Sequence, residues 1–402
     1  MAFVLYYQRM STSDKPHAAA LLPPGVARGS ATRRQFLGGA TLAFLAGTCG
    51  RLAAAGASGP LPEGIVPREA EFWTRLDNNA IRCDLCPRHC RVAEGKRGYC
   101  RVRENRGGSY FTLVHSRPCA MHLDPIEKKP FFHVLPGTKA FSLATVGCNL
   151  HCKFCQNWDI AQASPEDVPA AVRPPDSIAE AAARAGARTL AFTYSEPTVF
   201  YEYMRDCAKA AAGRGIHSIL ISNGFINEAP LRALLPHLKA VKIDLKAFTQ
   251  SFYGDVCDGL LAPVLETLKI IAGSGVWLEI VCLVIPTLND HPQELQRLAA
   301  WVVKELGPDV PLHFTRYQPL YQLRNLPPTP PATLLRARDL ALQEGCRFVY
   351  TGNVPGLSGQ DTACPFCGKT LVSRYSYVIR ENLLRGNRCP SCQRVIPGAW
   401  EA

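Results

Sequence analysis

The chain contains 402 residues, of which 47% are hydrophobic and 19% are charged, and its formal net charge is +12. That length and apolar content are ample for one large core with appended modules. Of the 17 cysteines, 11 fall into three groups and six are scattered, and the short gaps within the groups indicate metal ligation more than a disulfide framework. The positive charge is compatible with an anionic partner, such as nucleic acid or an acidic protein surface, and equally with ordinary surface charge.

The first 60 residues are expected to lie outside the folded part of the chain. Residues 1–31 are rich in alanine, proline and serine, which predicts disorder. Arg33 and Arg34 then precede a short apolar run at 38–47 and small residues at 53–57, a pattern similar to a twin-arginine export signal. A disordered tail with a chance arginine pair is the alternative. The apolar run is too short for a stable transmembrane helix.

Residues 61–138 are predicted to form a small cysteine-rich module and a linker into the core. Its cysteines have the spacing C-x2-C-x3-C-x9-C, and they are Cys83, Cys86, Cys90 and Cys100. The segment has little hydrophobic content of its own, so a bound metal would have to organise it. Zinc is the favoured metal at these four residues, and an iron–sulfur cluster is the alternative.

Residues 139–353 alternate apolar runs with amphipathic segments that are typical of helices. The apolar runs lie at 139–146, 188–194, 217–222, 239–245, 276–284, 310–316 and 346–351. Near-continuous apolar strands separated by helices predict an α/β fold with a parallel sheet, and about six such repeats predict a partial or full TIM-like barrel. Ser177 and Glu180 are expected to form a capping box at the start of one helix.

Three cysteines follow the first of these strands in the spacing C-x3-C-x2-C, and they are Cys148, Cys152 and Cys155. Three thiolates on one loop can hold three corners of a cubane [4Fe-4S] cluster, which leaves one iron open to a substrate or cofactor. A zinc loop with a distant fourth ligand is the alternative. His151 is expected to point away from the cysteine face of so short a loop.

Polar side chains stand at the ends of several later strands. Glu196 follows the second strand, Asn223 ends the third, Asp244 and Lys246 end the fourth, and Asn289 follows the fifth. Each has an ordinary explanation, such as a turn at Asn223 or a buried ion pair between Asp244 and Lys246. Because the carboxyl ends of barrel strands meet at one mouth, these residues together surround the predicted cluster with hydrogen-bonding groups.

Residues 354–402 are predicted to form a C-terminal module with two C-x2-C knuckles. The four cysteines are Cys364, Cys367, Cys389 and Cys392. Four thiolates in this arrangement indicate a zinc ribbon, and their closed coordination sphere predicts a structural role. A rubredoxin-like iron site is the alternative.

The C-x3-C-x2-C loop, with Phe154 just before its last cysteine, resembles that of radical S-adenosylmethionine (radical SAM) enzymes. The resemblance implies that the three cysteines bind the cluster, that the open iron chelates the amino and carboxylate groups of SAM, and that Phe154 lies near the adenine. It also implies that the reduced cluster cleaves the sulfonium. The 5′-deoxyadenosyl radical formed in this way abstracts a hydrogen from the substrate.

The resemblance extends to other contacts with SAM. Glu196 matches the acidic residue of the family's Gly-Gly-Glu-type motif, which contacts the amino group, although the glycines are absent. Asn223, Asp244 and Lys246 match segments of the glycyl-radical-enzyme activase branch, where they help to hold the polar groups of the cofactor. Asn289 is implied as a contact for adenine or ribose.

A closer resemblance is to the AmmeMemoRadiSam-system radical SAM enzymes, which are related to pyruvate formate-lyase-activating enzymes. It covers essentially all of residues 80–398. Its motifs lie at 83–90, 124–130, 147–149, 155–158, 311–314 and 350–353. The resemblance implies Memo-type companion proteins as partners and does not supply a substrate.

The predicted reaction is hydrogen abstraction from a protein glycine, as in glycyl-radical activases, or from another partner-bound substrate. Radical modification of a small molecule or RNA is the alternative enzyme function. A non-catalytic electron-transfer protein with several metal centres is the third hypothesis. The enzyme hypotheses require a reductant such as flavodoxin or ferredoxin, which favours the cytoplasm, whereas the twin-arginine-like segment favours export or membrane association.

Overall fold

The computed structural model describes residue 61 and residues 64–401 of the chain. The tail and the twin-arginine-like segment predicted within residues 1–60 lie outside the described residues. Within the described part, no helix is both long enough and apolar enough to span a membrane.

The centre of the structure is an eight-stranded sheet with the strand order β14-β13-β12-β11-β10-β9-β8-β7. Its strands are β7 (Ala120–Pro125), β8 (Lys139–Ala144), β9 (Thr189–Phe192), β10 (His217–Ser222), β11 (Ala240–Asp244), β12 (Trp277–Val284), β13 (Leu312–Arg316) and β14 (Val349–Gly352). Strands β8 to β14 run parallel, whereas β7 runs antiparallel to β8. Among the strands that the structure describes, β7 and β14 do not pair, so the predicted TIM-like fold is confirmed as a partial barrel.

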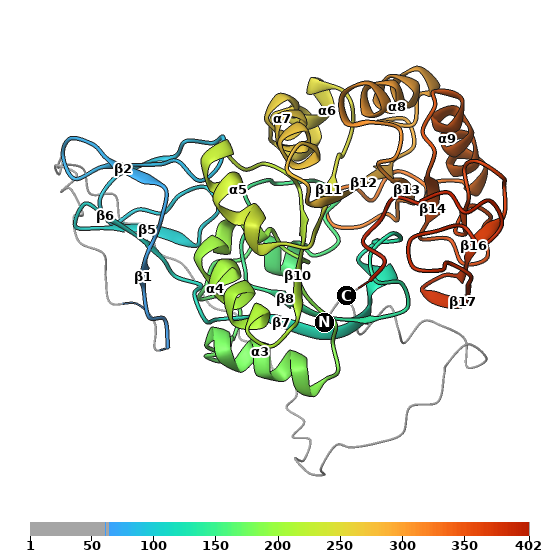
Figure 1. Cartoon of the computed structure of the whole chain (residues 1–402). Helices are drawn as coiled ribbons and strands as arrows, with labels where there is room; N and C mark the ends of the chain where they lie inside the picture. Colours follow the sequence, from blue (N-terminus) through green and yellow to red (C-terminus); the bar gives the residue numbers. More distant parts are fainter. Residues whose placement is uncertain (1–60, 62–63, 402) are drawn as a thin grey trace, which may run out of the picture. The chain divides into compact units, whose positions relative to one another are not determined.

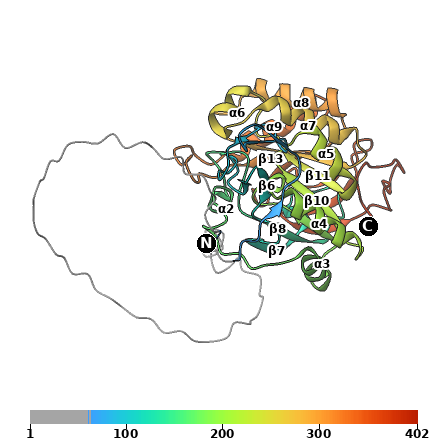
Figure 2. The ribbon, with the colours of Figure 1, turned by 90° about the vertical axis from the view of Figure 1, so that its left-hand side faces the viewer.

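Helices connect the parallel strands, as the alternating sequence pattern predicts. They are α2 (Trp158–Ala161), α3 (Pro175–Arg184), α4 (Tyr201–Ala212), α5 (Glu228–Leu234), α6 (Gln250–Cys257), α7 (Leu261–Ala272), α8 (Pro292–Leu306) and α9 (Pro331–Gln343), with the 3-10 turns η1 (Ile126–Lys128), η2 (Pro197–Phe200) and η3 (Leu235–His237). Figures 1 and 2 show helices α3 to α9 around the outside of the curved sheet. In α8, Leu295, Leu298 and Val302 are buried at helical spacing and join the main hydrophobic core.

The helix start predicted at Ser177 is wrong. Helix α3 begins at Pro175, and Ser177 lies inside its first turn, where the hydroxyl donates to the Pro174 carbonyl at 2.8 Å. Proline has a fixed φ close to the helical value and no N–H group to satisfy. The first helical position therefore suits Pro175, and the helix starts there without a capping box.

The cysteine-rich module consists of two small antiparallel sheets. One contains β1 (Arg68–Glu69), β6 (Ser109–Thr112) and β5 (Arg103–Arg106), and the other contains β2 (Trp73–Arg75), β3 (Ile81–Cys83) and β4 (Arg91–Val92). The buried residues Ile81, Val102 and Tyr110 of this module share one hydrophobic core with Phe192 and Leu220 of the barrel. The module therefore packs directly against the barrel.

The segment predicted as a linker takes part in the barrel. Strand β7 already pairs with β8, so the sheet begins before the predicted boundary at 138/139. After β7, Ile126, Phe131 and Val134 join a buried cluster with Ala140 and Ala240, which lie near the amino ends of β8 and β11. These side chains fill the amino end of the barrel as an apolar plug.

A buried carboxylate fixes this plug to the sheet. Glu279 of β12 accepts hydrogen bonds from the backbone N–H groups of Phe132 at 3.0 Å and His133 at 2.9 Å. It also accepts one from His313 Nε2 of β13 at 2.7 Å. Burial alone would raise the pKa of Glu279, but the hydrogen bond from His313 and the other donors hold it below its ordinary value. Glu279 is therefore a fully buried anion with its hydrogen bonds satisfied.

The C-terminal module is joined to the same plug. It contains one antiparallel sheet of β15 (Thr362–Ala363), β16 (Thr370–Tyr375) and β17 (Val378–Asn382). The Nδ1–H group of His133 donates to the Pro397 carbonyl at 2.7 Å, and its Nε2 accepts from the Tyr350 hydroxyl at 2.6 Å. Burial lowers the pKa of His133 to about 4. The ring is therefore neutral at neutral pH and links β14 to the end of the chain.

The Glu279→Gln variant tests this anchor, because it keeps the shape of the side chain and removes its charge. An amide nitrogen cannot accept hydrogen bonds, so at least one buried donor loses its partner. We expect the free energy of unfolding to fall by about 3 kcal/mol, as measured by urea denaturation at about pH 7. Equal stability of the variant and the wild type at that pH would contradict the role of Glu279.

The same variant has a defined pH dependence. The folded pKa of Glu279 lies below the ordinary value of 4.5, so its contribution to stability is present above that pH and is lost as the pH falls through the folded pKa. The difference in unfolding free energy between the wild type and Glu279→Gln should therefore shrink on acidification. A difference that stays constant down to about pH 3 would contradict the assignment of Glu279 as a buried anion.

Candidate active site

The cysteine loop leaves the carboxyl end of β8 through Gly147. This residue has a backbone φ of +100°, a conformation that glycine adopts readily and other residues rarely. A Cβ at this position would lie 2.6 Å from Val102 Cγ1 and 2.9 Å from the Cys100 carbonyl oxygen. Glycine therefore allows the strand to turn into the loop while it lies against the N-terminal module.

Two neighbouring segments hold the loop in place. The His151 and Lys153 N–H groups donate to the carbonyls of Cys257 and Val256, at the end of α6, over 3.0 and 2.9 Å. The His151 ring stacks on Tyr99 of the N-terminal module, with 4.2 Å between the ring centroids. His151 therefore packs the loop against that module.

The three cysteines of the loop are spaced more widely than one metal ion allows. Within the described residues, the only group of three or more metal-ligand side chains with all ligand atoms within 4.8 Å lies in the C-terminal module. At least two of the sulfurs of Cys148, Cys152 and Cys155 are therefore more than 4.8 Å apart. Zinc–sulfur bonds of about 2.3 Å can span at most about 4.6 Å between two ligands, so the three thiols as placed do not form a single-ion zinc site.

Local contacts act differently on the three thiols of this loop. The Leu150 N–H group donates to Cys148 Sγ at 3.4 Å. A hydrogen bond with the Cys257 thiol lowers the pKa of Cys152, and the nearby Lys246 ammonium lowers it further. Metals bind the thiolate, so the contacts of Cys152 favour coordination, whereas burial raises the pKa of Cys148 and of Cys155. Cys257 belongs to no sequence motif, and only the fold brings it to the loop.

Glu196 ties the ends of β9 and β10 together. Its buried carboxylate accepts from the backbone N–H groups of Asn223 at 2.8 Å and Thr198 at 3.0 Å, and from the Ser222 hydroxyl at 2.7 Å. Its own N–H group donates to the Gly147 carbonyl at 3.4 Å. Burial raises the pKa of Glu196, and the same donors partly offset that effect. The structure thus places Glu196 beside the loop with its carboxylate engaged by the protein.

Asn223 lies between Glu196 and the first cysteine of the loop. Its Nδ2 donates to Asn149 Oδ1 at 2.9 Å and lies 3.8 Å from Cys148 Sγ. Its Oδ1 accepts from the Phe225 N–H group at 2.8 Å. The side chain therefore reaches the cysteine loop and also orients Asn149.

Charged side chains of both signs stand at the end of β11. Asp244 pairs with Lys242 and, at 3.5 Å, with Lys246. Burial raises the pKa of Asp244, but the two lysines lower it more, so the carboxylate is ionised. The Lys246 ammonium also lies 5.7 Å from the centre of the Phe154 ring. The side chains of Asp244 and Lys246 are 36% and 13% exposed, so they form a charged edge that a ligand can reach.

Asn289 stabilises this charged edge through hydrogen bonds to the backbone. Its Nδ2 donates to the carbonyls of Lys246 at 2.7 Å and Leu283 at 2.9 Å, and its Oδ1 accepts from the Ile285 N–H group at 2.6 Å. The side chain is buried and its amide bonds to backbone on both sides. Asn289 therefore fixes the ends of β11 and β12 relative to each other.

The two outer cysteine groups differ in their arrangement. Cys83, Cys86, Cys90 and Cys100 line one cavity, which Asn149 of the cysteine loop also lines. No three of these sulfurs in the described structure lie within 4.8 Å of one another, so they surround this space and do not form a compact group.

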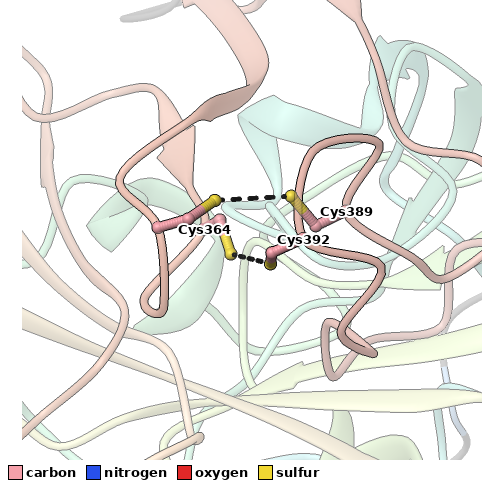
Figure 3. Close-up of side chains that lie close together, drawn as sticks. Cys364, Cys389 and Cys392 are labelled. Atoms are coloured by element: carbon pink, nitrogen blue, oxygen red, sulfur yellow. Dashed lines mark hydrogen bonds between the residues drawn. The ribbon is translucent and has the colours of Figure 1, made fainter.

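The C-terminal cysteines form a compact group. The sulfurs of Cys364, Cys367, Cys389 and Cys392 all lie within 4.8 Å of one another. Cys364 and Cys392 are 3.6 Å apart, and Cys367 and Cys389 are 3.7 Å apart (Figure 3). A tetrahedral site with metal–sulfur bonds of about 2.3 Å has ligands about 3.8 Å apart, so this group can bind a single metal ion.

The Glu196→Gln variant tests the carboxylate at the barrel mouth. A glutamine amide can satisfy fewer of the three donors that face this position, so we expect the free energy of unfolding without SAM to fall by about 2 kcal/mol. The matched control is Glu228→Gln, which changes an exposed carboxylate paired with Arg232 on α5 and should shift stability by less than about 0.5 kcal/mol. Urea denaturation measures both, and equal stabilities would contradict a supporting role for Glu196.

Comparisons with known proteins identify the family. A family model described as the radical SAM superfamily matches residues 142–299. An uncharacterized protein of Methanocaldococcus jannaschii is 44% identical over 310 residues, which are 77% of this chain and 92% of that protein.

Two solved structures are similar at low identity. A domain of pyruvate-formate lyase-activating enzyme from Bacteroides vulgatus has 15% identity and a TM-score of 0.37, over 40% of this chain and 98% of that chain. A radical SAM methyltransferase from Sphaerobacter thermophilus has 13% identity and a TM-score of 0.46, over 74% of this chain and 80% of that chain. From the family model and the sequence relative, this chain belongs to the radical SAM superfamily, whose enzymes use a [4Fe-4S] cluster and SAM.

Proposed function

We propose that this enzyme cleaves SAM reductively and that the 5′-deoxyadenosyl radical abstracts a hydrogen from a protein, as in glycyl-radical activases, or from another partner-bound substrate. The observation that carries the proposal is the loop of Cys148, Cys152 and Cys155 at the carboxyl end of β8, within the region that matches the superfamily. When bound, the cluster and SAM supply the electron and the radical.

The side chains at the barrel mouth complement SAM in charge and polarity. Lys246 and Asp244 offer a cation and an anion 3.5 Å apart, which suit the carboxylate and the ammonium of an amino acid. Phe154 offers a buried aromatic face beside them. Glu196 and Asn289 form hydrogen bonds within the protein, and these bonds hold the strand ends that carry the ligand-facing groups. The task of these groups would be to position the cofactor against the substrate.

An exposed aromatic surface beside the loop supports a macromolecular substrate. Trp158, at the start of α2, is 38% exposed and stacks on Tyr321 with 5.2 Å between the ring centroids. Leu320 next to it is also 38% exposed. The Gln322 N–H group donates to the Lys153 carbonyl, which joins this surface to the cysteine loop. Exposed apolar and aromatic groups next to an active site are typical of protein-docking surfaces.

The reaction itself is tested with the full chain, reconstituted anaerobically with iron and sulfide and then reduced in the presence of SAM. We expect the wild type to form 5′-deoxyadenosine. Cys152→Ala should abolish the product, because it removes one of the three predicted cluster ligands. The matched control is Cys346→Ala, a buried cysteine whose thiol donates to the Ala299 carbonyl of α8, which should keep both iron and activity. Product formation by Cys152→Ala at the wild-type rate would refute the proposal.

The same reaction tests the class of substrate. A candidate partner, first a Memo-type companion protein, is prepared with deuterated glycine and mixed with the reduced enzyme and SAM. Deuterium in the 5′-deoxyadenosine would support abstraction from that protein. Deuterium that appears only with labelled RNA or a labelled small molecule would overturn the protein-substrate part of the proposal and leave SAM cleavage intact.

We also propose that Cys364, Cys367, Cys389 and Cys392 hold a structural zinc ion. The sulfur separations of 3.6 and 3.7 Å support it, because they match a tetrahedral zinc site. Cys389→Ala should lose about one zinc ion per chain and lower the melting temperature, since a structural site contributes to folding. Metal analysis of the purified chain provides the measurement. Unchanged zinc in this variant, or iron in place of zinc in the wild type, would contradict the proposal.

A further inference from the structure

The cavity of the N-terminal module has the features of a metal-cluster site. We propose that Cys83, Cys86, Cys90 and Cys100 bind a second cluster of the [4Fe-4S] type and do not bind zinc. The proposal goes beyond SAM cleavage and does not depend on it, because it concerns a different set of cysteines. It reverses the preference for zinc that the sequence alone suggests.

The sulfur positions support a cluster over zinc. In the described part of the chain, no three of these four sulfurs lie within 4.8 Å of one another, whereas all four sulfurs of the C-terminal group do. Zinc–sulfur bonds of about 2.3 Å limit the separation of two ligands to about 4.6 Å. One zinc ion therefore cannot bind even three of these cysteines as they stand. A cubane has four irons at separate corners, and each iron takes one thiolate. Its thiolate ligands therefore lie further apart than those of a single zinc ion.

Two buried polar side chains indicate that the ligand of this cavity is an anion. Arg103 is 1% exposed, and its Nη2 pairs with Glu202, while its Nε and Nη1 have no partner among the described residues. The hydroxyl of Tyr110, which is 0% exposed, also has no partner among them. Both side chains line the cavity.

These donors need an acceptor, and a cluster supplies one. A buried donor without a partner costs about 1–3 kcal/mol. The sulfurs of a cluster with four thiolate ligands accept hydrogen bonds, and its net negative charge would pair with the Arg103 guanidinium. The same cavity therefore offers thiolates for the irons and donors for the sulfurs.

Gly98 leaves space for the Tyr110 hydroxyl in this cavity. A Cβ on Gly98 would lie 2.6 Å from Tyr110 Oη and 3.9 Å from Cys90 Sγ, so any larger residue would displace the hydroxyl from the cavity. The Gly98 N–H group donates to the Arg103 carbonyl at 3.0 Å. The turn that carries Cys100 is thereby fixed to the strand that carries Arg103.

The cavity adjoins the active-site loop. Asn149, which follows Cys148, is one of its lining residues. Arg88, another lining residue, donates to the Asn149 carbonyl at 2.6 Å. The second cluster would therefore lie directly beside the loop of the first.

The test is a metal count on the full chain after anaerobic reconstitution with iron and sulfide. We expect about eight irons per wild-type chain, and about half of that iron in a variant that combines Cys148→Ala, Cys152→Ala and Cys155→Ala. The iron that remains should give the Mössbauer spectrum of a [4Fe-4S] cluster. A combined variant without iron, or a wild type with about four irons and about two zinc ions, would overturn the proposal. SAM cleavage is not needed for any of these outcomes.

The Tyr110→Phe variant, in the same combined background, gives a second readout. It keeps the buried ring and removes only the unpartnered hydroxyl. We expect it to retain its iron and to show a lower midpoint potential, because a hydrogen bond to a cluster sulfur stabilises the more negative, reduced state. Cys119→Ala, a cysteine outside all three groups, is the matched control and should change neither value. An unchanged potential in Tyr110→Phe would overturn its assignment as a donor to the cluster.

Discussion

The buried carboxylate of Glu196 accepts hydrogen bonds from Thr198 of η2 and from the end of β10, while its backbone donates to Gly147, where the cysteine loop begins. An ion in this position would be costly without partners, and three donors within 3.0 Å supply them. Asn223 and Asn149 then extend the same network to Cys148. The place of the first cysteine in the barrel mouth therefore depends on a buried side chain, Glu196, which is 2% exposed.

A second buried carboxylate, Glu279, connects segments at the opposite end of the barrel. Glu279 fixes the apolar plug through two backbone N–H groups and His313, and His133 carries the connection on to the C-terminal module. Each end of the partial barrel thus contains a buried carboxylate whose donors come from segments far apart in the sequence. The strands between them have little freedom to shift, so the active-site groups are held in place before any ligand binds.

The sequence predicts the strands well because each is an almost continuous apolar run between helices, and such runs are typical of parallel strands buried on both faces. It cannot predict that β7 precedes them, since the half-exposed 120–125 segment lacks that pattern. Nor can the sequence separate residues that contact a ligand from residues that hold the strand ends in place. The donors to Glu196 and the acceptors of Asn289 are mostly backbone groups, which leave no signature in the side chains. Cys257 cannot be predicted from the sequence, because it belongs to no motif and meets Cys152 only through the fold.

The cysteine groups show why spacing alone cannot identify a metal. Cys83 and Cys86 have the same C-x2-C spacing as Cys364 and Cys367, and this spacing defines only the local turn.

What differs is how far apart the fold holds the two halves of each group and which donors it directs between them. In the C-terminal module two knuckles face each other at the separation of one tetrahedral ion. In the N-terminal module the sulfurs stand further apart around a cavity, beside a buried arginine and a tyrosine hydroxyl without partners in the described structure. A single ion needs close thiolates, whereas a cluster needs room and benefits from donors to its sulfurs. The surroundings of the cysteines, more than their order in the chain, therefore determine which metal centre each group can hold.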